Sequence, residues 1–158
     1  MKLMIVALAL ATPACGDPAV IQPIEFNHGR HVKDQSLPCE LCHKTVKTSA
    51  ISGRPTIATC AMCHSASMGE SAEAEKVHGY VERGEEIAWL RLYRVPTHVR
   101  YSHYRHVEVG AIPCLNCHGA IGESQAPPHL PLVDLTMDFC LDCHRDRGVS
   151  TDCIACHM

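Results

Sequence analysis

Five copies of the pattern Cys-x-x-Cys-His constrain this chain more than any other feature, and they take ten of its eleven cysteines. Two thiols at this spacing can form thioether bonds to the vinyl groups of a haem, and the histidine that follows can bind the iron. The pattern therefore predicts five covalently bound haems c with their iron. The attachment sites, numbered 1 to 5 in chain order, are Cys39/Cys42/His43, Cys60/Cys63/His64, Cys114/Cys117/His118, Cys140/Cys143/His144 and Cys153/Cys156/His157.

Zinc ribbons and the disulfide frameworks of small exported proteins also contain paired cysteines. Neither requires a histidine directly after the second cysteine. With twelve histidines in 158 residues, chance would seldom place one after each of five pairs. Covalent haem is therefore the favoured interpretation over structural zinc or disulfides.

An 18-residue unit occurs twice, 75 positions apart. Phe26–His43 and Tyr101–His118 each contain an aromatic residue, a His-x-x-His pair and an attachment site, and 8 of the 18 positions are identical. The repeat predicts an internal duplication into two halves of two haems each, residues 26–69 and 101–148. Residues 149–158 then add the fifth haem, which completes a single haem-binding domain over residues 26–158.

Seven histidines lie outside the attachment sites, and five iron atoms need a sixth ligand. One imidazole of each His-x-x-His pair could bind the local iron and the other a neighbouring iron. This reasoning predicts four distal ligands, His28, His31, His103 and His106.

The fifth distal ligand stays open among three histidines. His98 and His129 are the leading candidates, and His78 is a third. Met137 could supply a thioether ligand, but its position three residues before Cys140 favours packing on the porphyrin.

Large aromatic residues are scarce, with two Phe, one Trp and four Tyr in the whole chain. A large core built from protein alone is therefore not expected, and haem burial should supply much of the hydrophobic driving force. We expect loops and short helices wrapped around five haems, with one-turn helices around the attachment sites, and an apoprotein that does not fold.

Residues 70–100 connect the two halves. The best helical signal in the chain runs from Ser71 to Arg83, with Ser71 as the N-cap and Gly84 as the stop. The following segment, 87–93, alternates loosely and is expected to be extended.

The N-terminus has the composition of a secretion signal over residues 1–15. Lys2 precedes an apolar run that is too short to span a bilayer, which needs about 20 residues. Cys15 follows this run at a position that suits a lipid anchor, and residues 16–25 then form a tether. Ordinary cleavage after Ala14 and an uncleaved anchor are the alternatives.

Charge argues against a nucleic-acid partner. The formal net charge is −3 before any haem propionates are counted, and the basic residues form no run. Arg30 and Arg105, inside the two His-x-x-His units, are candidates to pair with propionates.

Several segments resemble one known group of proteins. Phe26–His31, Ile51–Ser65, Ile87–His103 and Leu135–Arg145 resemble the pentahaem cytochrome c subunit of alternative complex III and of related quinone reductase complexes, which is similar to class III multihaem cytochromes c. The resemblance departs at Tyr93, where histidine is expected. It implies a class III-like fold and a haem wire between a quinone-linked membrane core and a periplasmic redox carrier.

We therefore expect an electron carrier rather than an enzyme, with two imidazoles on each iron. Its expected location is the periplasmic face of a bacterial membrane, inner or outer, with a lipid anchor and other subunits of a quinol-linked complex as partners. The alternatives are a free-standing anchored or soluble electron shuttle, a multihaem reductase with one open haem, and a protein for haem storage or structure.

Overall fold

Short helices joined by long loops make up the chain in the computed structural model, which describes residues 18–67 and 71–158. In chain order the helices are η1 (Gly29–Asp34), α1 (Cys39–Cys42), α2 (Ile57–His64), α3 (Ala72–Arg83), η2 (Tyr104–Val109), α4 (Leu115–His118), η3 (Ile121–Glu123), α5 (Met137–Asp146) and α6 (Cys153–Cys156). The described residues form no strand, only one isolated antiparallel bridge between Val99 and His157. No helix in these two ranges is long and apolar enough to cross a membrane.

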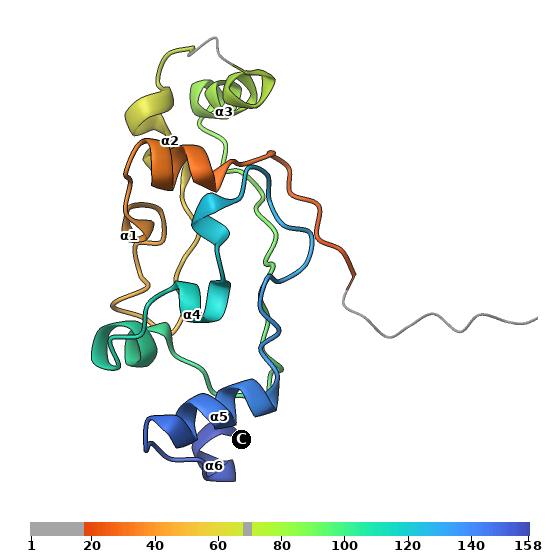
Figure 1. Ribbon diagram of the computed structural model, residues 1–158. Coiled ribbons are helices and arrows are strands. Elements are labelled where there is room, and N and C mark those ends of the chain that lie inside the picture. Colours follow the sequence, from red (N-terminus) through yellow and green to blue (C-terminus); the bar gives the residue numbers. More distant parts are fainter. Residues whose placement is uncertain (1–17, 68–70) are drawn as a thin grey trace, which may run out of the picture.

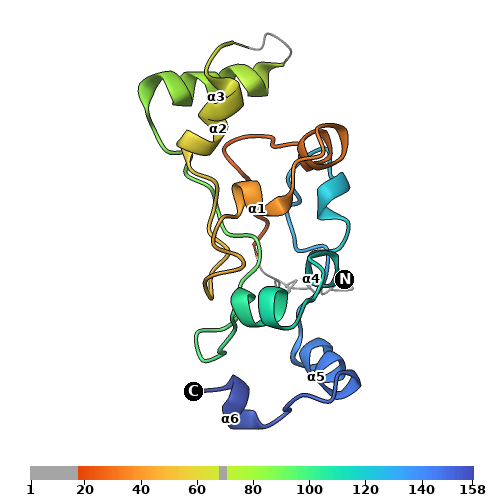
Figure 2. The same cartoon turned by 90° about the vertical axis from the view of Figure 1, so that its left-hand side faces the viewer.

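The described molecule is elongated. Helices α2 and α3 lie at one end and α5 and α6 at the other, with α1 and α4 between them (Figure 1). The view turned by 90° shows the same order along the long axis (Figure 2). Segments 85–95 and 125–135 run side by side along the long axis, on one side of the molecule between α3 and α5 (Figure 1).

Each attachment site lies on a helix. Helices α1, α4 and α6 have only 4 residues each, as expected for one-turn helices at these sites. Helices α2 and α5 are longer, and the Thr136 hydroxyl caps α5 by accepting a hydrogen bond from the Phe139 N–H at 3.1 Å. One helical turn brings residues three and four apart onto the same face, so both cysteines and the histidine can face one haem.

Each His-x-x-His pair lies at the start of a π-helical turn, η1 or η2, with its first histidine as the N-cap, and no sequence pattern predicted these turns. Each turn is followed by a non-glycine residue in the left-handed region, Ser36 with φ 54° and Ala111 with φ 49°. Both residues stand three positions before the first cysteine of an attachment site. This conformation costs an L-residue about 1–2 kcal/mol. The backbone is therefore locally strained where it turns from each π-helical turn into the attachment site.

The expected connecting helix is confirmed. Helix α3 begins after Ser71, whose hydroxyl accepts a hydrogen bond from the Ala74 N–H at 3.1 Å, and it ends at Gly84, where φ is 64°. Its Val77 packs with Ile24 and Ile87 in a small cluster at the α2–α3 end of the molecule.

Very few side chains are buried in the described part of the chain. The buried apolar residues are Ile24, Val46, Val77 and Ile87, and Thr59 is the buried polar residue. A domain of this size normally buries far more apolar surface. The described polypeptide therefore has only a small hydrophobic core of its own.

Candidate haem-attachment and ligand sites

The ten cysteines of the attachment sites are all free thiols, and none forms a disulfide. Within residues 18–67 and 71–158, no group of three or more His, Cys, Asp or Glu side chains converges as a metal-binding cluster. A zinc ribbon would bring four such ligands together. The thiols instead lie in pairs along the molecule, each pair followed by its histidine.

The two thiols of site 2, Cys60 and Cys63, differ in their exposure to solvent. Cys63 is exposed, whereas Cys60 in the same motif is partly buried, although both lie on α2. Packing explains the difference, because Cys60 contacts the small cluster around Val77 and Cys63, three residues later, is not among the residues of that cluster. The structure thus places Cys63 at the surface, and its thioether bond stays a prediction. The other exposed attachment thiols are Cys39, Cys140 and Cys153.

Interactions between thiols show that site 1 lies between sites 2 and 3. Burial raises the pKa of the Cys60 thiol, and the nearby Cys42 thiol raises it further, so sites 2 and 1 are neighbours. Burial also raises the pKa of Cys39, and the nearby Cys114 thiol raises it further. Sites 1 and 3 are therefore neighbours as well.

The same kind of interaction joins sites 3, 4 and 5. Burial is the main cause that raises the pKa of Cys117, and the nearby thiols Cys143 and Cys140 of site 4 raise it further. Burial and then Cys156 of site 5 raise the pKa of Cys140. The five sites thus form one row in the order 2–1–3–4–5, which differs from their order in the chain and follows the long axis from α2 to α6 (Figure 1).

Three histidines of the attachment sites each lie at nearly the same distance from a second imidazole ring. The ring centroids are 6.4 Å apart for His31 and His64, 6.4 Å for His103 and His118, and 6.2 Å for His106 and His144. A metal bound to one nitrogen of each ring at about 2 Å places the ring centres about 6 Å apart. These pairs therefore have the spacing that a haem iron requires.

His28 lies close to His43 of site 1. Burial lowers the pKa of His28 to about 4, and the neighbouring His43 and His31 contribute to this shift. Burial also lowers the pKa values of His64, His103 and His118. These imidazoles therefore stay neutral near pH 7, and the neutral form is the one that coordinates a metal.

At site 5, residues 98–100, which precede the second half, form backbone hydrogen bonds with residues 156–158. The Arg100 N–H donates to the Cys156 carbonyl at 2.7 Å, and the Met158 N–H donates to the His98 carbonyl at 3.0 Å. This pairing stacks the His98 and His157 rings with centroids 5.4 Å apart and planes 21° apart. Each of the five attachment-site histidines therefore has at least one partner imidazole nearby.

Backbone carbonyls orient several of these rings by hydrogen bonding to Nδ1, which directs Nε2 towards the site. The contacts are His31 to Asn27 (2.8 Å), His43 to Gly53 (2.9 Å), His103 to Ala50 (3.0 Å), His106 to Ser102 (2.8 Å) and His144 to Ser150 (2.7 Å). The Nδ1 atoms of His28 and His64 are buried without such a partner.

Gly53 illustrates how a loop supplies one of these carbonyls. Its φ is 73°, and an added Cβ would lie 2.9 Å from the Thr45 hydroxyl oxygen. Only glycine fits this turn without strain, and the turn aims the Gly53 carbonyl at His43. This contact was not predicted, and the one signal for it in the sequence is a glycine ten residues after an attachment histidine.

One aromatic ring holds both histidines of each His-x-x-His pair. Phe26 meets His28 edge-on at 4.8 Å and stacks on His31 at 4.4 Å. Tyr101 does the same with His103 at 4.9 Å and His106 at 4.6 Å. Burial raises the pKa of Tyr101 to about 12, so its hydroxyl stays protonated near neutral pH.

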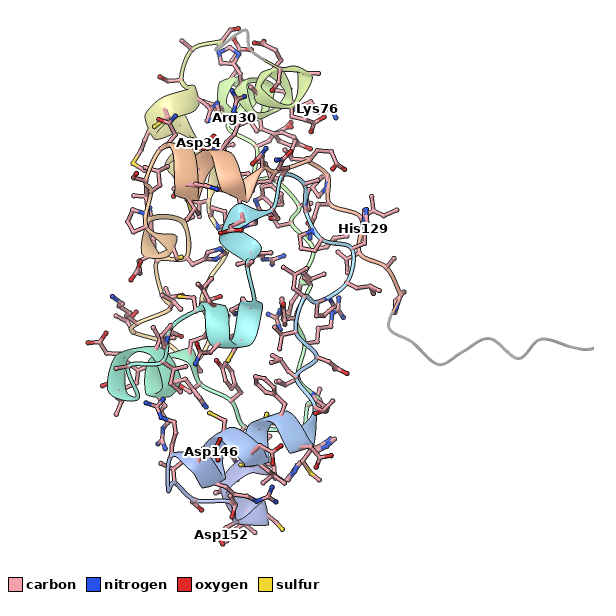
Figure 3. The ribbon with its side chains drawn as sticks, in the orientation of Figure 1. Arg30, Asp34, Lys76, His129, Asp146 and Asp152 are labelled. Atoms are coloured by element: carbon pink, nitrogen blue, oxygen red, sulfur yellow. The ribbon has the colours of Figure 1, made fainter. Side chains whose placement is uncertain are left out.

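The other sequence candidates lie differently. His129 exchanges two hydrogen bonds with Val20, through its Nδ1 at 3.0 Å and its carbonyl at 2.8 Å, and it lies on the side of the molecule where the described chain begins (Figure 3). His78 Nδ1 is 3.8 Å from a Glu82 carboxylate oxygen, and the nearby His78 contributes to the lowered pKa of His64 after burial and His31. The Met137 side chain is largely exposed.

Tyr93, where the family resemblance led us to expect histidine, contacts site 3 through its ring. The ring meets His118 edge-on with centroids 4.5 Å apart. Its hydroxyl accepts hydrogen bonds from the Leu132 and Val133 N–H groups at 2.9 and 3.4 Å. Tyr93 therefore packs beside an attachment histidine and anchors segment 129–133.

Two comparisons show which known proteins this sequence is similar to. The pattern of the class III cytochrome C family matches residues 7–87. The chain is also 32% identical over 160 residues to the protein named menaquinone reductase, multiheme cytochrome c subunit, of Nitratidesulfovibrio vulgaris. This match covers 86% of the present chain and 76% of that relative.

Proposed function

Because the chain belongs to the class III cytochrome c family, and is thus a multihaem electron carrier rather than a catalytic enzyme, we propose that it carries electrons through five haems c, one at each attachment site. Bound haem iron supplies the one-electron redox chemistry. The polypeptide attaches each haem through two thioethers and orients two neutral imidazoles towards it.

The single observation that carries this proposal is the pairing of imidazoles. We assign the ligand pairs His28/His43, His31/His64, His103/His118, His106/His144 and His98/His157 to sites 1 to 5 in that order. Within each His-x-x-His unit, the first histidine serves the local site and the second serves the next site along the chain. The proposal leaves His129, His78 and Met137 without an iron.

The near-equal ring distances around Phe26 and Tyr101 support a duplicated arrangement of two haems per half, followed by site 5. Sites 2 and 5 are the ends of the row, so electrons enter and leave there. Full ligation at all sites leaves no iron open to a substrate, which favours a carrier over a multihaem reductase.

The name of the relative points to the setting, since that protein is a subunit of a menaquinone reductase. We infer that the present chain is likewise the cytochrome subunit of a quinone-linked membrane complex, such as an alternative complex III. It would lie on the periplasmic face of the membrane after export, with a lipid on Cys15. Cys15 and the rest of the signal segment lie outside the described residues.

The first test counts haems and their ligands. Mass spectrometry of the purified holoprotein should show five covalent haems, and ferric electron paramagnetic resonance should show only low-spin iron. A high-spin signal equal to one haem in five, together with cyanide binding, would contradict the ligand assignment and favour a reductase.

The second test addresses the complex. Membranes are solubilised mildly, separated on a native gel, stained for haem and probed for this chain. Migration in a large band with other subunits is the expected result. Migration at the mass of the pentahaem protein alone would favour a free-standing shuttle.

A further inference from the structure

One side of the molecule combines exposed apolar side chains with two arginines. Pro18, Arg91, Leu92, Arg94, His129 and Leu130 surround a hollow of about 110 Å³, and together they form what we call the tether face. Hydrogen bonds between Val20 and His129 and between Gln22 and Leu90 hold its three chain segments together. Leu130 is 52% exposed, and Pro18 is exposed as well.

The tether face points away from the row of attachment sites. Tyr93 directs its ring at His118, and the side chains next to it in an extended segment point to the opposite side. Leu92 and Arg94 therefore face outward, where both line the hollow. A haem at site 3 would leave this face uncovered.

Its two arginines have no acidic partner among the described residues. No carboxylate in residues 18–67 or 71–158 forms an ion pair with Arg91 or Arg94, and Arg94 Nε reaches only the Arg91 carbonyl, at 3.5 Å. The chain as a whole is acidic, with formal charge −3. Two unpaired guanidinium groups beside apolar side chains therefore suit an anionic surface with an apolar layer beneath it.

The short stretch of chain between Pro18 and the lipid anchor at Cys15 identifies that surface as the membrane. Pro18 lines the hollow, and it lies only three positions after Cys15 in the chain. A fully extended chain spans at most about 3.3–3.6 Å per residue, so a lipid on Cys15 lies within about 10 Å of the tether face. The membrane that holds the lipid must come equally close.

We propose that the tether face rests on the anionic headgroups of the bilayer, with Arg91 and Arg94 contacting lipid phosphates and Leu130 reaching the interface. This inference rests on the lipid attachment proposed above. Segments 85–95 and 125–135 contain all residues of this face except Pro18, and both run along the long axis of the molecule (Figure 1). The row of sites therefore lies alongside the membrane, and both of its ends point sideways towards neighbouring proteins.

Hydrogen exchange on the lipidated holoprotein tests the proposal. The protein is reconstituted on vesicles of phosphatidylethanolamine with phosphatidylglycerol, and in parallel on neutral phosphatidylcholine vesicles. Residues 18–22, 90–95 and 129–131 should exchange more slowly on the anionic vesicles, and high salt should reduce this protection. An arginine near an anionic surface contributes about a fivefold factor in affinity, so the double variant Arg91→Glu/Arg94→Glu should lose the protection.

The control reverses two other exposed charges, Lys76→Glu/Arg83→Glu, both on α3 and both paired with nearby glutamates. Lys76 lies away from His129 (Figure 3). This variant should keep the protection. Haem absorbance checks that all variants carry the same number of haems.

Three results would overturn the proposal: equal protection on neutral vesicles, protection that survives reversal of both arginines, or protection that occurs only in the native multisubunit complex. The last result would assign the face to a protein partner. A mass spectrum without lipid on Cys15 would also overturn it. The haem count and the low-spin signals test the proposed electron carrier separately, because they do not depend on the lipid.

Discussion

Residues 26–64 and 101–144 place their histidines alike but support them differently. The Phe26–His31 and Tyr101–His106 rings stack at 4.4 and 4.6 Å, and the planes of the His31/His64 and His106/His144 pairs meet at 38° and 39°. His64, however, has a buried Nδ1 without a partner, whereas His144 Nδ1 lies 2.7 Å from the Ser150 carbonyl. Ring placement thus follows the residues that repeat in sequence, and the supporting contacts follow the loops that do not.

The largest effect is expected when the haems are absent from both regions. The chain produced without haem attachment should remain unfolded, because the described polypeptide buries only Ile24, Val46, Val77 and Ile87 among its apolar side chains. Circular dichroism and amide proton dispersion, measured beside the holoprotein as control, check this. A cooperative thermal transition in the apoprotein would contradict it.

The next effect tests whether the second histidine of each pair serves the same role in both regions. His31→Ala and His106→Ala should each convert one haem in five to the high-spin form, at sites 2 and 4, because each removes one proposed axial ligand. Electron paramagnetic resonance and carbon monoxide binding measure this fraction. His129→Ala is the control and should leave all five low-spin; a high-spin fraction in that variant would instead make His129 a ligand.

A smaller effect should distinguish the two regions. The haem at site 4 should have a lower reduction potential than the haem at site 2, because the Ser150 carbonyl accepts a hydrogen bond from His144 and makes that ligand more basic. His64 lacks such a contact. A redox titration followed by nuclear magnetic resonance, with each haem assigned, measures both potentials. A higher potential at site 4 than at site 2 would show that these carbonyl contacts do not determine the order of the two reduction potentials.

The smallest expected effect concerns the two left-handed residues, which are equivalent in the two regions. Ser36→Gly and Ala111→Gly should each stabilise the holoprotein by up to about 1 kcal/mol, since glycine adopts a positive φ without strain. Chemical denaturation measures the free energy of unfolding. Ala120→Gly is the control at φ −77° and should not stabilise. A gain at only one of the two equivalent positions would indicate that the turns differ.

The sequence predicted the features that depend on short, local patterns. Helix α3 has the predicted cap at Ser71 and stop at Gly84, because these residues act within one turn of the helix. The expected one-turn helices occur at three attachment sites, whereas α2 and α5 at the other two are longer than one turn. The attachment residues and the ligand assignments themselves stay predictions.

Features that depend on contacts between distant segments were not visible in the sequence. The row order 2–1–3–4–5 arises because Cys39 meets Cys114 across 75 positions. The exposure of Cys63 beside a partly buried Cys60 likewise depends on a cluster formed by distant segments. Carbonyl contacts such as Ala50 with His103 depend on backbone atoms, which every residue possesses and no side-chain pattern reports. The π-helical turns also have no motif of their own.

The pairing of histidines also has a consequence for biogenesis. In all five proposed pairs the distal histidine precedes its attachment motif in the chain, from His28 before His43 to His98 before His157. Ribosomes make the chain from its N-terminus, so each second ligand exists before the cysteines that capture its haem. Every haem can therefore become fully ligated as soon as it is attached, and no partly ligated, peroxide-reactive iron has to wait for a later segment of the polypeptide.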